Sequence, residues 1–355
     1  MINQDQNKTN NKRQKVIITG AAGFIGGHVT EYFYKNDIDV SCFIRNSSDL
    51  TYIKEFPIKI INGSIVDPNN LENSLKDANC VIHIAALARD WGKYKDFYET
   101  NVIGTINVLK ACKTNNIQNV IITGSISSYG EEDSKEIKTE EHPFNSHYEY
   151  FLDSIFPCKM NYYRDTKALA TKEAIKFAIE NNLNLTIIEP VWVYGENEFN
   201  TGFYEYIKSV KSKIPFSLGS KKNKFHVVYA KDLARAYFLA FKKKLSGVNR
   251  ILIGNMQIDY ANKIYSTFCN ELGVKKPKNI AKQIVYPIGF LMELVYTIFS
   301  IKKAPLLTRG RVNMFYDNIE YSTLKAEELL GFTNNYSIED GIKETVRWYK
   351  ENGLI

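Results

Sequence analysis

Near its N-terminus the chain reads Val16-Ile17-Ile18-Thr19-Gly20-Ala21-Ala22-Gly23-Phe24-Ile25-Gly26, and an apolar pattern of helical period follows. The β-branched residues predict a strand, and glycines at 20, 23 and 26 predict a tight turn into a helix. One glycine permits the reversal, one lets a pyrophosphate reach backbone N–H groups, and one lets the helix pack closely on the strand. The N-terminus of that helix then faces the anion. An ordinary glycine-rich turn without a ligand is the alternative interpretation.

Strand and helix patterns alternate up to residue 195. Short β-branched runs predict strands at 39–44, 58–61, 80–86, 120–123 and 185–195, and helical patterns are expected at 69–78, from 101 and from 162. The run 80–86 is almost continuously apolar, which is typical of parallel strands covered on both faces. We therefore predict an α/β fold with a Rossmann-type doubly wound parallel sheet, whose site lies at the carboxyl ends of the strands.

With 355 residues and 44% hydrophobic content, the chain is long enough for two structural units. We predict a disordered tail at 1–14, an NAD(P)-binding domain at 15–195 completed by 225–250, and a smaller C-terminal substrate-binding domain at 196–224 and 251–355. The tail is rich in Asn, Gln and Lys and lacks the apolar core of a signal peptide, which favours a cytoplasmic protein. Residues 131–160 show little periodicity and are expected to form a lid or binding loop.

Composition excludes several classes of site. Five cysteines occur singly, without C-x-x-C or histidine pairs at metal spacing, so we expect reduced thiols and no metal. The net charge of +7 comes from dispersed lysines, which favours a solvated surface over attraction to acidic lipid or a phosphorylated ligand. No nucleic-acid partner is expected.

Two strand ends bear on the cofactor. Arg45 follows the strand 39–44, where an acidic residue accepts from the 2′-hydroxyl of NAD and an arginine suits the 2′-phosphate of NADP. We therefore favour NADP(H), and NAD(H) with a solvated Arg45 is the alternative. Ala85 and Ala86 end the strand 80–86 with small side chains, which leave room for a dinucleotide.

The pattern Tyr-x-x-x-Lys occurs three times, as Tyr163/Lys167, Tyr204/Lys208 and Tyr321/Lys325. The first lies on a helix between a serine-bearing strand end and the next parallel strand, which brings it to the nicotinamide. A lysine one turn away and a cationic nicotinamide would lower the pKa of the phenol from about 10. Tyr163 would then act as acid and base, Lys167 would lower its pKa and hold the ribose, and Ser125 would orient the substrate oxygen.

These features together resemble an extended short-chain dehydrogenase/reductase of the NAD-dependent epimerase/dehydratase family, over about residues 15–355. The motifs T-G-A-A-G-F-I-G, H-I-A-A, N-V-I-G-T, Y-R-D-T-K and P-V-W-V-Y-G occur in family order, beginning at 19, 83, 101, 163 and 190. Residues 305–309 and 321–332 resemble the 3β-hydroxysteroid dehydrogenase and dihydroflavonol reductase branch. The resemblance implies catalytic Ser125, Tyr163 and Lys167, and a hydride moved between C4 of the nicotinamide and a carbinol or ketone carbon.

The resemblance also implies a set of cofactor-binding residues. They are Gly20, Gly23, Phe24, Ile25, Gly26, Arg45, Ser64, Ile65, Ala85, Ala86, Asn101, Tyr163, Lys167, Pro190 and Val193. Three positions depart from the family pattern: Ser64 stands for an aspartate, Glu189 for an arginine and Tyr229 for a histidine.

The segment 284–301 has helical periodicity with an unusual share of apolar residues. Glu293, Thr297 and Ser300 form one narrow polar stripe, whereas an ordinary surface helix is apolar over about a third of its circumference. We interpret this helix as buried or as a wall of the substrate pocket, with an interfacial membrane helix as the alternative and a membrane span as the least favoured. The cations that would suit the membrane alternative are Lys282, Lys302 and Lys303.

The leading hypothesis is an NADP(H)-dependent oxidoreductase of a hydrophobic hydroxy or keto substrate, such as a sterol, a 3-oxo lipid or a 3-ketosphingoid base. The alternative is a nucleotide-sugar epimerase or dehydratase with tightly bound NAD, whose second pyrophosphate Arg235, Arg309 and Arg311 would hold. A dinucleotide-sensing protein without turnover is the third hypothesis, against which the catalytic set argues. Two further partners stay open: a second copy, because relatives often pair through the helices near Thr100 and Lys167, and a membrane surface at 284–301.

Overall fold

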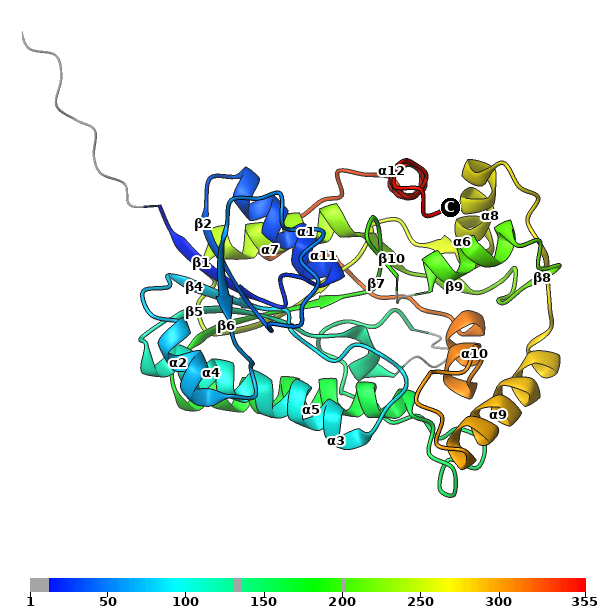
Figure 1. Ribbon diagram of the computed structural model, residues 1–355, viewed down its shortest axis with the longest axis horizontal. Coiled ribbons are helices and arrows are strands. Elements are labelled where there is room, and N and C mark those ends of the chain that lie inside the picture. The colour runs from blue at the N-terminus through cyan, green and yellow to red at the C-terminus, as the bar shows by residue number, and fades with distance from the viewer. Residues whose placement is uncertain (1–12, 131–135, 200–201) are drawn as a thin grey trace, which may run out of the picture.

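The computed structural model describes residues 13–130, 136–199 and 202–355, and these surround a seven-stranded parallel sheet (Figure 1). Its order is β11-β6-β5-β4-β1-β2-β3. The strands are β1 (Lys15–Thr19), β2 (Asp39–Ile44), β3 (Lys59–Asn62), β4 (Cys80–His83), β5 (Asn119–Thr123), β6 (Asn184–Pro190) and β11 (Val248–Ile253). The first six follow the order of a dinucleotide-binding sheet, which confirms the predicted fold class. Most of the predicted tail and residues 131–135 of the predicted lid lie outside the described residues.

Helices cover both faces of the sheet (Figure 1). On one face α1 (Phe24–Lys35) packs beside α7 (Ala230–Lys243), and on the other lie α2 (Pro68–Ser74), α4 (Gly104–Thr114) and α5 (Met160–Glu180). Side chains of β1 alternate between the two layers, since Val16 and Ile18 join the core under α1 and α7 whereas Ile17 joins the core under α4 and α5. The sheet is therefore doubly wound.

Two predicted strands are shorter than expected. The strand expected at 80–86 ends at His83. Beyond His83 the chain leaves the sheet and passes beside the turn between β1 and α1, where the N–H of Ala85 donates to Oγ1 of Thr19 at 3.4 Å. The strand expected at 185–195 is interrupted at Val191. Its second part, β7 (Trp192–Tyr194), leaves the large sheet and pairs with β10 (Val227–Tyr229).

The remaining elements build most of the region beside the carboxyl ends of the strands (Figure 1). They are α6 (Phe203–Lys211), β8 (Phe216–Ser217), β9 (Lys224–Phe225), β12 (Asp259–Tyr260), α8 (Ala261–Leu272), β13 (Lys278–Asn279), α9 (Lys282–Ile298), α10 (Arg309–Tyr316), α11 (Leu324–Leu330) and α12 (Ile338–Glu351). However, α11 contacts β11 and α7. The chain thus returns to the large sheet after α10, and the predicted domain boundaries stay a prediction.

The helix α9 lies at a corner of the molecule, packed on α10 (Figure 1). Its buried residues are Val285, Gly289 and Glu293, and the apolar residues of its other side face solvent. The expectation that this helix is deeply buried is therefore wrong. Of the predicted polar stripe only Glu293 is buried, whereas Thr297 is partly exposed and Ser300 is exposed beyond the end of α9. Glu293 faces inward because Gly289 lets α9 approach the backbone of Thr308 and because Arg309 is its ion-pair partner. Among the described helices, none is long and apolar enough to cross a membrane.

Candidate active site

The glycine turn between β1 and α1 is tightly closed. Gly20 has a φ of +74°, and a Cβ on Gly26 would lie 2.1 Å from the carbonyl oxygen of Gly20. Gly23 is exposed and caps α1 without a side-chain hydrogen bond. Since the first-turn N–H groups of a helix have no partner inside it, they are open here to an anion. The turn therefore fits the pyrophosphate of a dinucleotide.

Lys167 lies on α5 and reaches the carboxyl end of β5. Its ammonium donates a hydrogen bond of 2.6 Å to the backbone carbonyl of Thr123, and the residue is only 6% exposed. Burial lowers the pKa of Lys167 to about 8, against the opposing effect of the Glu189 carboxylate. The Lys167 ammonium therefore loses its proton more readily than that of an exposed lysine.

Tyr163 precedes Lys167 by one turn on the same face of α5 and is half-buried. From the other side of the sheet, the hydroxyl of Tyr237 on α7 lies 2.6 Å from Oγ1 of Thr123. Burial raises the pKa of Tyr237, the hydrogen bond to Thr123 lowers it, and the charge of an ionised Tyr163 raises it further. Tyr237 therefore places a buried hydroxyl at the end of β5, next to Thr123. No local sequence pattern singled out Tyr237, whose spacing on α7 is that of a core residue.

Ser125 caps the short 3-10 turn η2 (Ile126–Tyr129). Its Oγ accepts from the N–H of Ser127 at 3.2 Å and lies 2.7 Å from Oγ of Ser127. A second hydroxyl therefore accompanies the predicted one. Ser127 could not be singled out from the sequence, because three serines, at 125, 127 and 128, follow β5 within five residues.

Asn101 lies in a π-helical turn, η1 (Tyr98–Ile103), of a kind that is frequent at functional sites. Its Oδ1 accepts from the N–H of Leu87 at 2.7 Å, and its Nδ2 donates to Oγ1 of Thr166 at 3.1 Å. Both ends of the amide are thus engaged, and Asn101 fixes the segment after β4 against α5. Its predicted contact with a cofactor stays a prediction.

The other predicted cofactor residues gather at the same edge of the sheet. Arg45 is exposed directly after β2, and its guanidinium has no hydrogen-bond or ion-pair partner among the residues that the structure describes. Ile65, next to Ser64 after β3, covers Gly104, where a Cβ would lie 2.6 Å from Cδ1 of Ile65. The remaining members are Phe24 and Ile25 in the first turn of α1, Ala85 and Ala86 after β4, Pro190 at the end of β6, and Val193 in β7.

Glu189, which stands for the family's arginine, is fully buried in β6. Its Oε1 accepts from Nε of Arg250 on β11 at 3.2 Å, and the hydroxyl of Tyr129 donates to Oε2. Burial raises the pKa of Glu189, whereas the charge of Arg250 and the hydrogen bonds lower it. The arginine beside this position therefore comes from the neighbouring strand β11, as Arg250, and not from β6 itself.

The three arginines expected to hold a second pyrophosphate have partners within the protein. Arg309 donates to Glu293 at 2.9 and 3.0 Å, Arg311 donates to Asp90 at 2.9 Å, and Arg235 donates to the carbonyl of Thr333. Arg309 and Arg311 are therefore engaged in ion pairs, whereas Nε of Arg235 is buried without a hydrogen-bond partner among the described residues, and the predicted role of the three arginines stays a prediction.

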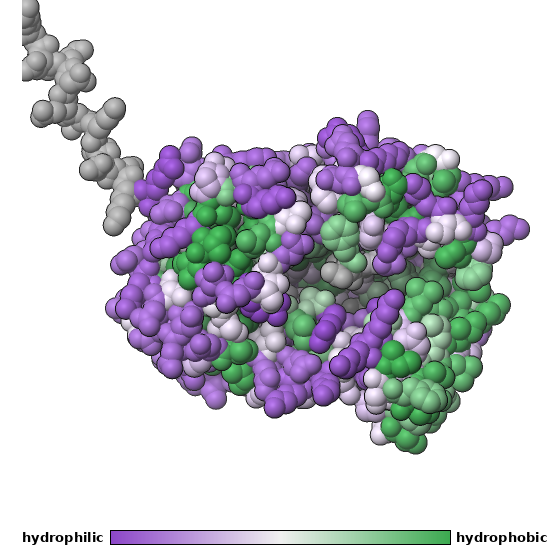
Figure 2. Space-filling model, viewed as in Figure 1, coloured by the Kyte–Doolittle hydropathy of each residue, from purple (hydrophilic) through white to green (hydrophobic). Residues whose placement is uncertain are grey.

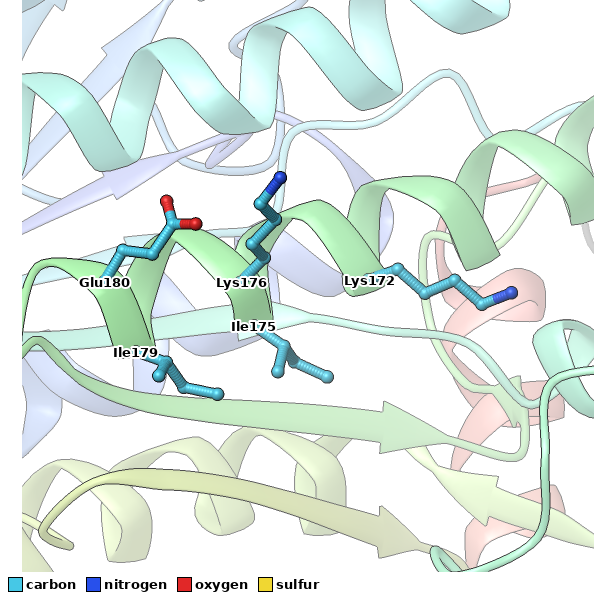
Figure 3. A pocket seen from close by; sticks show the side chains of 5 residues that line it. All are labelled: Lys172, Ile175, Lys176, Ile179 and Glu180. Carbon is cyan, nitrogen blue, oxygen red and sulfur yellow. The ribbon is translucent and has the colours of Figure 1, made fainter.

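Concave surface occurs at and away from this edge. Figure 2 shows a hollow in the middle of the molecule, beside the hydrophobic surface at the corner where Figure 1 places α9. A separate shallow concavity on α5 is lined by Lys172, Ile175, Lys176, Ile179 and Glu180 (Figure 3). Ile179 lies about 18 Å along the helix from Lys167 at about 1.5 Å per residue. This second concavity therefore extends along α5 away from Lys167, starting at Lys172, which lies about 7.5 Å along the helix from it.

Comparisons with known proteins agree with this geometry. The model of the NAD dependent epimerase/dehydratase family matches residues 16–254. Sterol-4-alpha-carboxylate 3-dehydrogenase, decarboxylating, of Saccharomyces cerevisiae is 27% identical over 96% of this chain and 99% of its own length. The 2-alkyl-3-oxoalkanoate reductase of Stenotrophomonas maltophilia is 23% identical over 93% of this chain and 97% of its own. Among solved structures, UDP-glucose 4-epimerase of Thermotoga maritima has a TM-score of 0.74 at 21% identity, covering 96% of this chain and 99% of its own.

Proposed function

The chain belongs to the NAD-dependent epimerase/dehydratase family and is an NAD(P)-dependent oxidoreductase that transfers a hydride. From that premise we propose that it interconverts a hydroxyl and a ketone on a hydrophobic substrate, with NADP(H) as its preferred cofactor. The observation that carries the proposal is the buried Lys167 one turn from Tyr163, at the strand edge that also bears the glycine turn.

Bound NAD(P)(H) supplies or accepts the hydride at C4 of its nicotinamide. The chain's own groups handle the proton: the Tyr163 phenol gives it to the carbonyl oxygen in reduction and takes it from the hydroxyl in oxidation. A positive Lys167 one turn away stabilises the phenolate, which lowers the pKa of Tyr163. Ser125 holds the substrate oxygen by a hydrogen bond. The backbone N–H groups at the start of α1 hold the pyrophosphate.

Arg45 supports the preference for NADP(H). It is an exposed cation at the end of β2, where the adenosine ribose lies in this fold, and the two residues after it are Asn46 and Ser47 rather than acids. A 2′-phosphate at this position would therefore be attracted by Arg45 and would meet no carboxylate at the next two residues.

Two observations support a hydrophobic substrate. The three arginines that a nucleotide sugar would need are bonded within the protein, and the hollow at the strand edge adjoins an apolar corner (Figure 2). The names of the two relatives narrow the first compounds to test. Both describe a reacting carbon adjacent to a carbon that bears a carboxylate. A 3-oxo or 3-hydroxy carboxylic acid with a large apolar body is thus the substrate class we favour.

The proposal is tested by following the oxidation of NADPH through its near-ultraviolet absorbance, which the oxidised cofactor lacks. Long-chain 2-alkyl-3-oxo acids and steroid ketones are offered with NADPH and with NADH. UDP-sugars are offered separately and their products are identified by chromatography, because epimerisation returns the hydride to the sugar and consumes no cofactor. Turnover of an apolar ketone with NADPH supports the proposal. Turnover of a UDP-sugar with cofactor that resists dialysis would overturn it in favour of an epimerase.

A homodimer belongs to the same proposal. The face built by η1, α4 and α5 carries the exposed apolar side chains Ile103 and Ile179. Pairing across this face would bury them. Light scattering gives the mass, and we expect Ile179→Lys to shift it from dimer toward monomer, whereas Leu324→Lys on α11 should leave it unchanged.

A further inference from the structure

The outward side of α9 is an apolar surface without a partner among the described residues. Ile284, Ile288, Leu291, Val295 and Ile298 follow one another at helical spacing, and each is between 45% and 61% exposed. In an ordinary surface helix such residues face the core. Here the orientation is inverted, since Glu293, paired with Arg309, faces the protein instead.

A second segment extends this surface. The loop residues Phe151, Leu152 and Ile155 are exposed as well. The ring of Phe151 meets Phe290 of α9 edge-on with centroids 5.4 Å apart, and its N–H donates to the hydroxyl of Tyr286 at 3.3 Å. We call the stripe of α9 together with these three loop residues the apolar corner. Figure 2 shows the hydrophobic surface projecting there from the rest of the molecule.

A buried arginine holds the two segments of the apolar corner together. Arg309 is 1% exposed and is paired with Glu293 of α9. The same guanidinium donates to the backbone carbonyls of Phe151 and Phe156, the latter at 2.5 Å. The loop therefore has a fixed position against α9, and the apolar corner is preformed.

Exposed lysines follow shortly after α9, and one exposed acid, Glu149, precedes the loop residue Phe151 by two positions. Between residues 283 and 301 the single charged side chain is the buried Glu293, and the exposed Lys302 and Lys303 follow directly. The loop's own acid, Asp153, is turned inward, where it accepts from the N–H of Cys158 at 2.8 Å and lies 3.3 Å from His147. An apolar surface bordered by lysines complements an apolar layer bordered by anions.

We propose that the apolar corner inserts into the interfacial layer of a lipid bilayer containing anionic lipids, with Lys302 and Lys303 at the headgroups. A second copy of the chain fits less well. A two-helix seam needs charged residues beside its apolar stripe, and α9 exposes none between 283 and 301. Two projecting corners also touch over little area when a twofold axis relates them.

The inference rests on the proposed function. It identifies a membrane surface as the place from which the protein takes up its hydrophobic substrate. A Cβ on Gly310 of α10 would lie 2.7 Å from Cβ of Met160, so the first turn of α5, just before Tyr163, packs directly on α10. At the other end of α9, the indole N–H of Trp91 donates to the carbonyl of Ile301 at 3.0 Å. The apolar corner is therefore attached both to the predicted catalytic helix and to the segment after β4.

The test is co-flotation of the full chain with phosphatidylcholine vesicles, with and without phosphatidylserine. We expect binding to the mixed vesicles and about tenfold weaker binding for Leu291→Glu and for Ile155→Glu, since each loses the burial of one apolar side chain. Lys302→Gln with Lys303→Gln should weaken binding to the mixed vesicles and leave the weak binding to phosphatidylcholine unchanged. The matched control is Leu324→Glu, which changes an equally exposed leucine on α11.

Three results would overturn the inference: no flotation of the wild-type chain, equal flotation of Leu291→Glu, or a dimer that Leu291→Glu converts to monomer. The last would identify a second copy as the occupant. Flotation is measured without substrate or cofactor, so it is independent of turnover. A chain that floats but reduces no apolar ketone would refute the proposed function and leave the membrane surface standing.

Discussion

Lys167 donates its hydrogen bond of 2.6 Å to the carbonyl of Thr123, so the ammonium is held by a neutral dipole rather than by a carboxylate. Burial therefore prevails, and the pKa of Lys167 falls to about 8 although Glu189 opposes the shift. A buried charge without an ion pair lowers the stability of the fold. The protein accepts that cost at the position where its proposed chemistry needs a cation.

Replacing Lys167 should stabilise the fold at neutral pH. The folded-state pKa of about 8 lies below the model value of 10.5, so below pH 8 the penalty of burying the charge is fully present. Between the two values the unfolded chain binds more protons, and the free energy of unfolding of the wild type rises with pH. At pH 7 we expect Lys167→Met to gain roughly 1–3 kcal/mol, the lost hydrogen bond offsetting part of the shift.

Urea titrations at pH 7 and pH 10 without cofactor measure this gain, which should shrink at the higher pH. Lys176→Met on the exposed side of α5 is the control and should change little at either pH. Equal destabilisation by Lys167→Met at both pH values would contradict the expectation.

Removing the hydroxyl of Tyr163 should stop the chemistry and spare cofactor binding. We expect Tyr163→Phe to lower kcat by about 10²- to 10⁴-fold, because general acid catalysis contributes about that much. The dissociation constant for NADPH, followed by its fluorescence, should stay within about twofold. Tyr204→Phe alters the tyrosine of a second Tyr-x-x-x-Lys pattern, on α6, and should keep full activity. Comparable losses in both variants would remove Tyr163 from its proposed role.

The sheet could be predicted from the sequence because each of its units is encoded locally. A β-branched run, a turn and a helical apolar pattern recur along the first half of the chain, and parallel order follows from their alternation. The strand ends were less predictable. Whether β4 ends at His83 or three residues later depends on the approach of Ala85 to Gly20, two residues far apart in the chain.

Side-chain partners in the candidate site could not be predicted in this way. Asn101 is bonded to Leu87 and Thr166, which come from two other segments. The pattern of α9 correctly placed Glu293 on one polar stripe, but periodicity shows which residues share a face and not which face meets the protein. The buried Arg309 decides that question for α9, and no spacing rule links it to Glu293.

Reversing the charge at Arg45 should change the choice of cofactor. Loss of a charge-assisted contact with the 2′-phosphate, worth about 1.5–3 kcal/mol, corresponds to about a 10- to 100-fold rise in KM for NADPH in Arg45→Glu. KM for NADH should stay the same or fall, because NAD carries no such phosphate and a glutamate at this position can accept from its 2′-hydroxyl. Arg347→Glu, an exposed arginine on α12, is the control. If both cofactors respond equally, Arg45 does not contact the 2′-phosphate and the preference for NADP(H) fails.

Breaking the ion pair between Glu293 and Arg309 should loosen the corner of the molecule that they hold together. Both side chains are at most 3% exposed, and removal of one partner from a buried pair costs about 3–5 kcal/mol because the other charge is left uncompensated. Glu293→Met should therefore lower the free energy of unfolding by about that amount in a urea titration. The double variant Glu293→Met with Arg309→Met should lose less than the sum of the two single changes, since no lone charge remains. In this double variant the carbonyls of Phe151 and Phe156 still lack the hydrogen bonds from Arg309. Backbone hydrogen exchange should therefore rise in the loop 151–156 and stay unchanged in β1. Strict additivity of the two losses would mean that the pair contributes no coupling and that α9 is held by its apolar contacts alone.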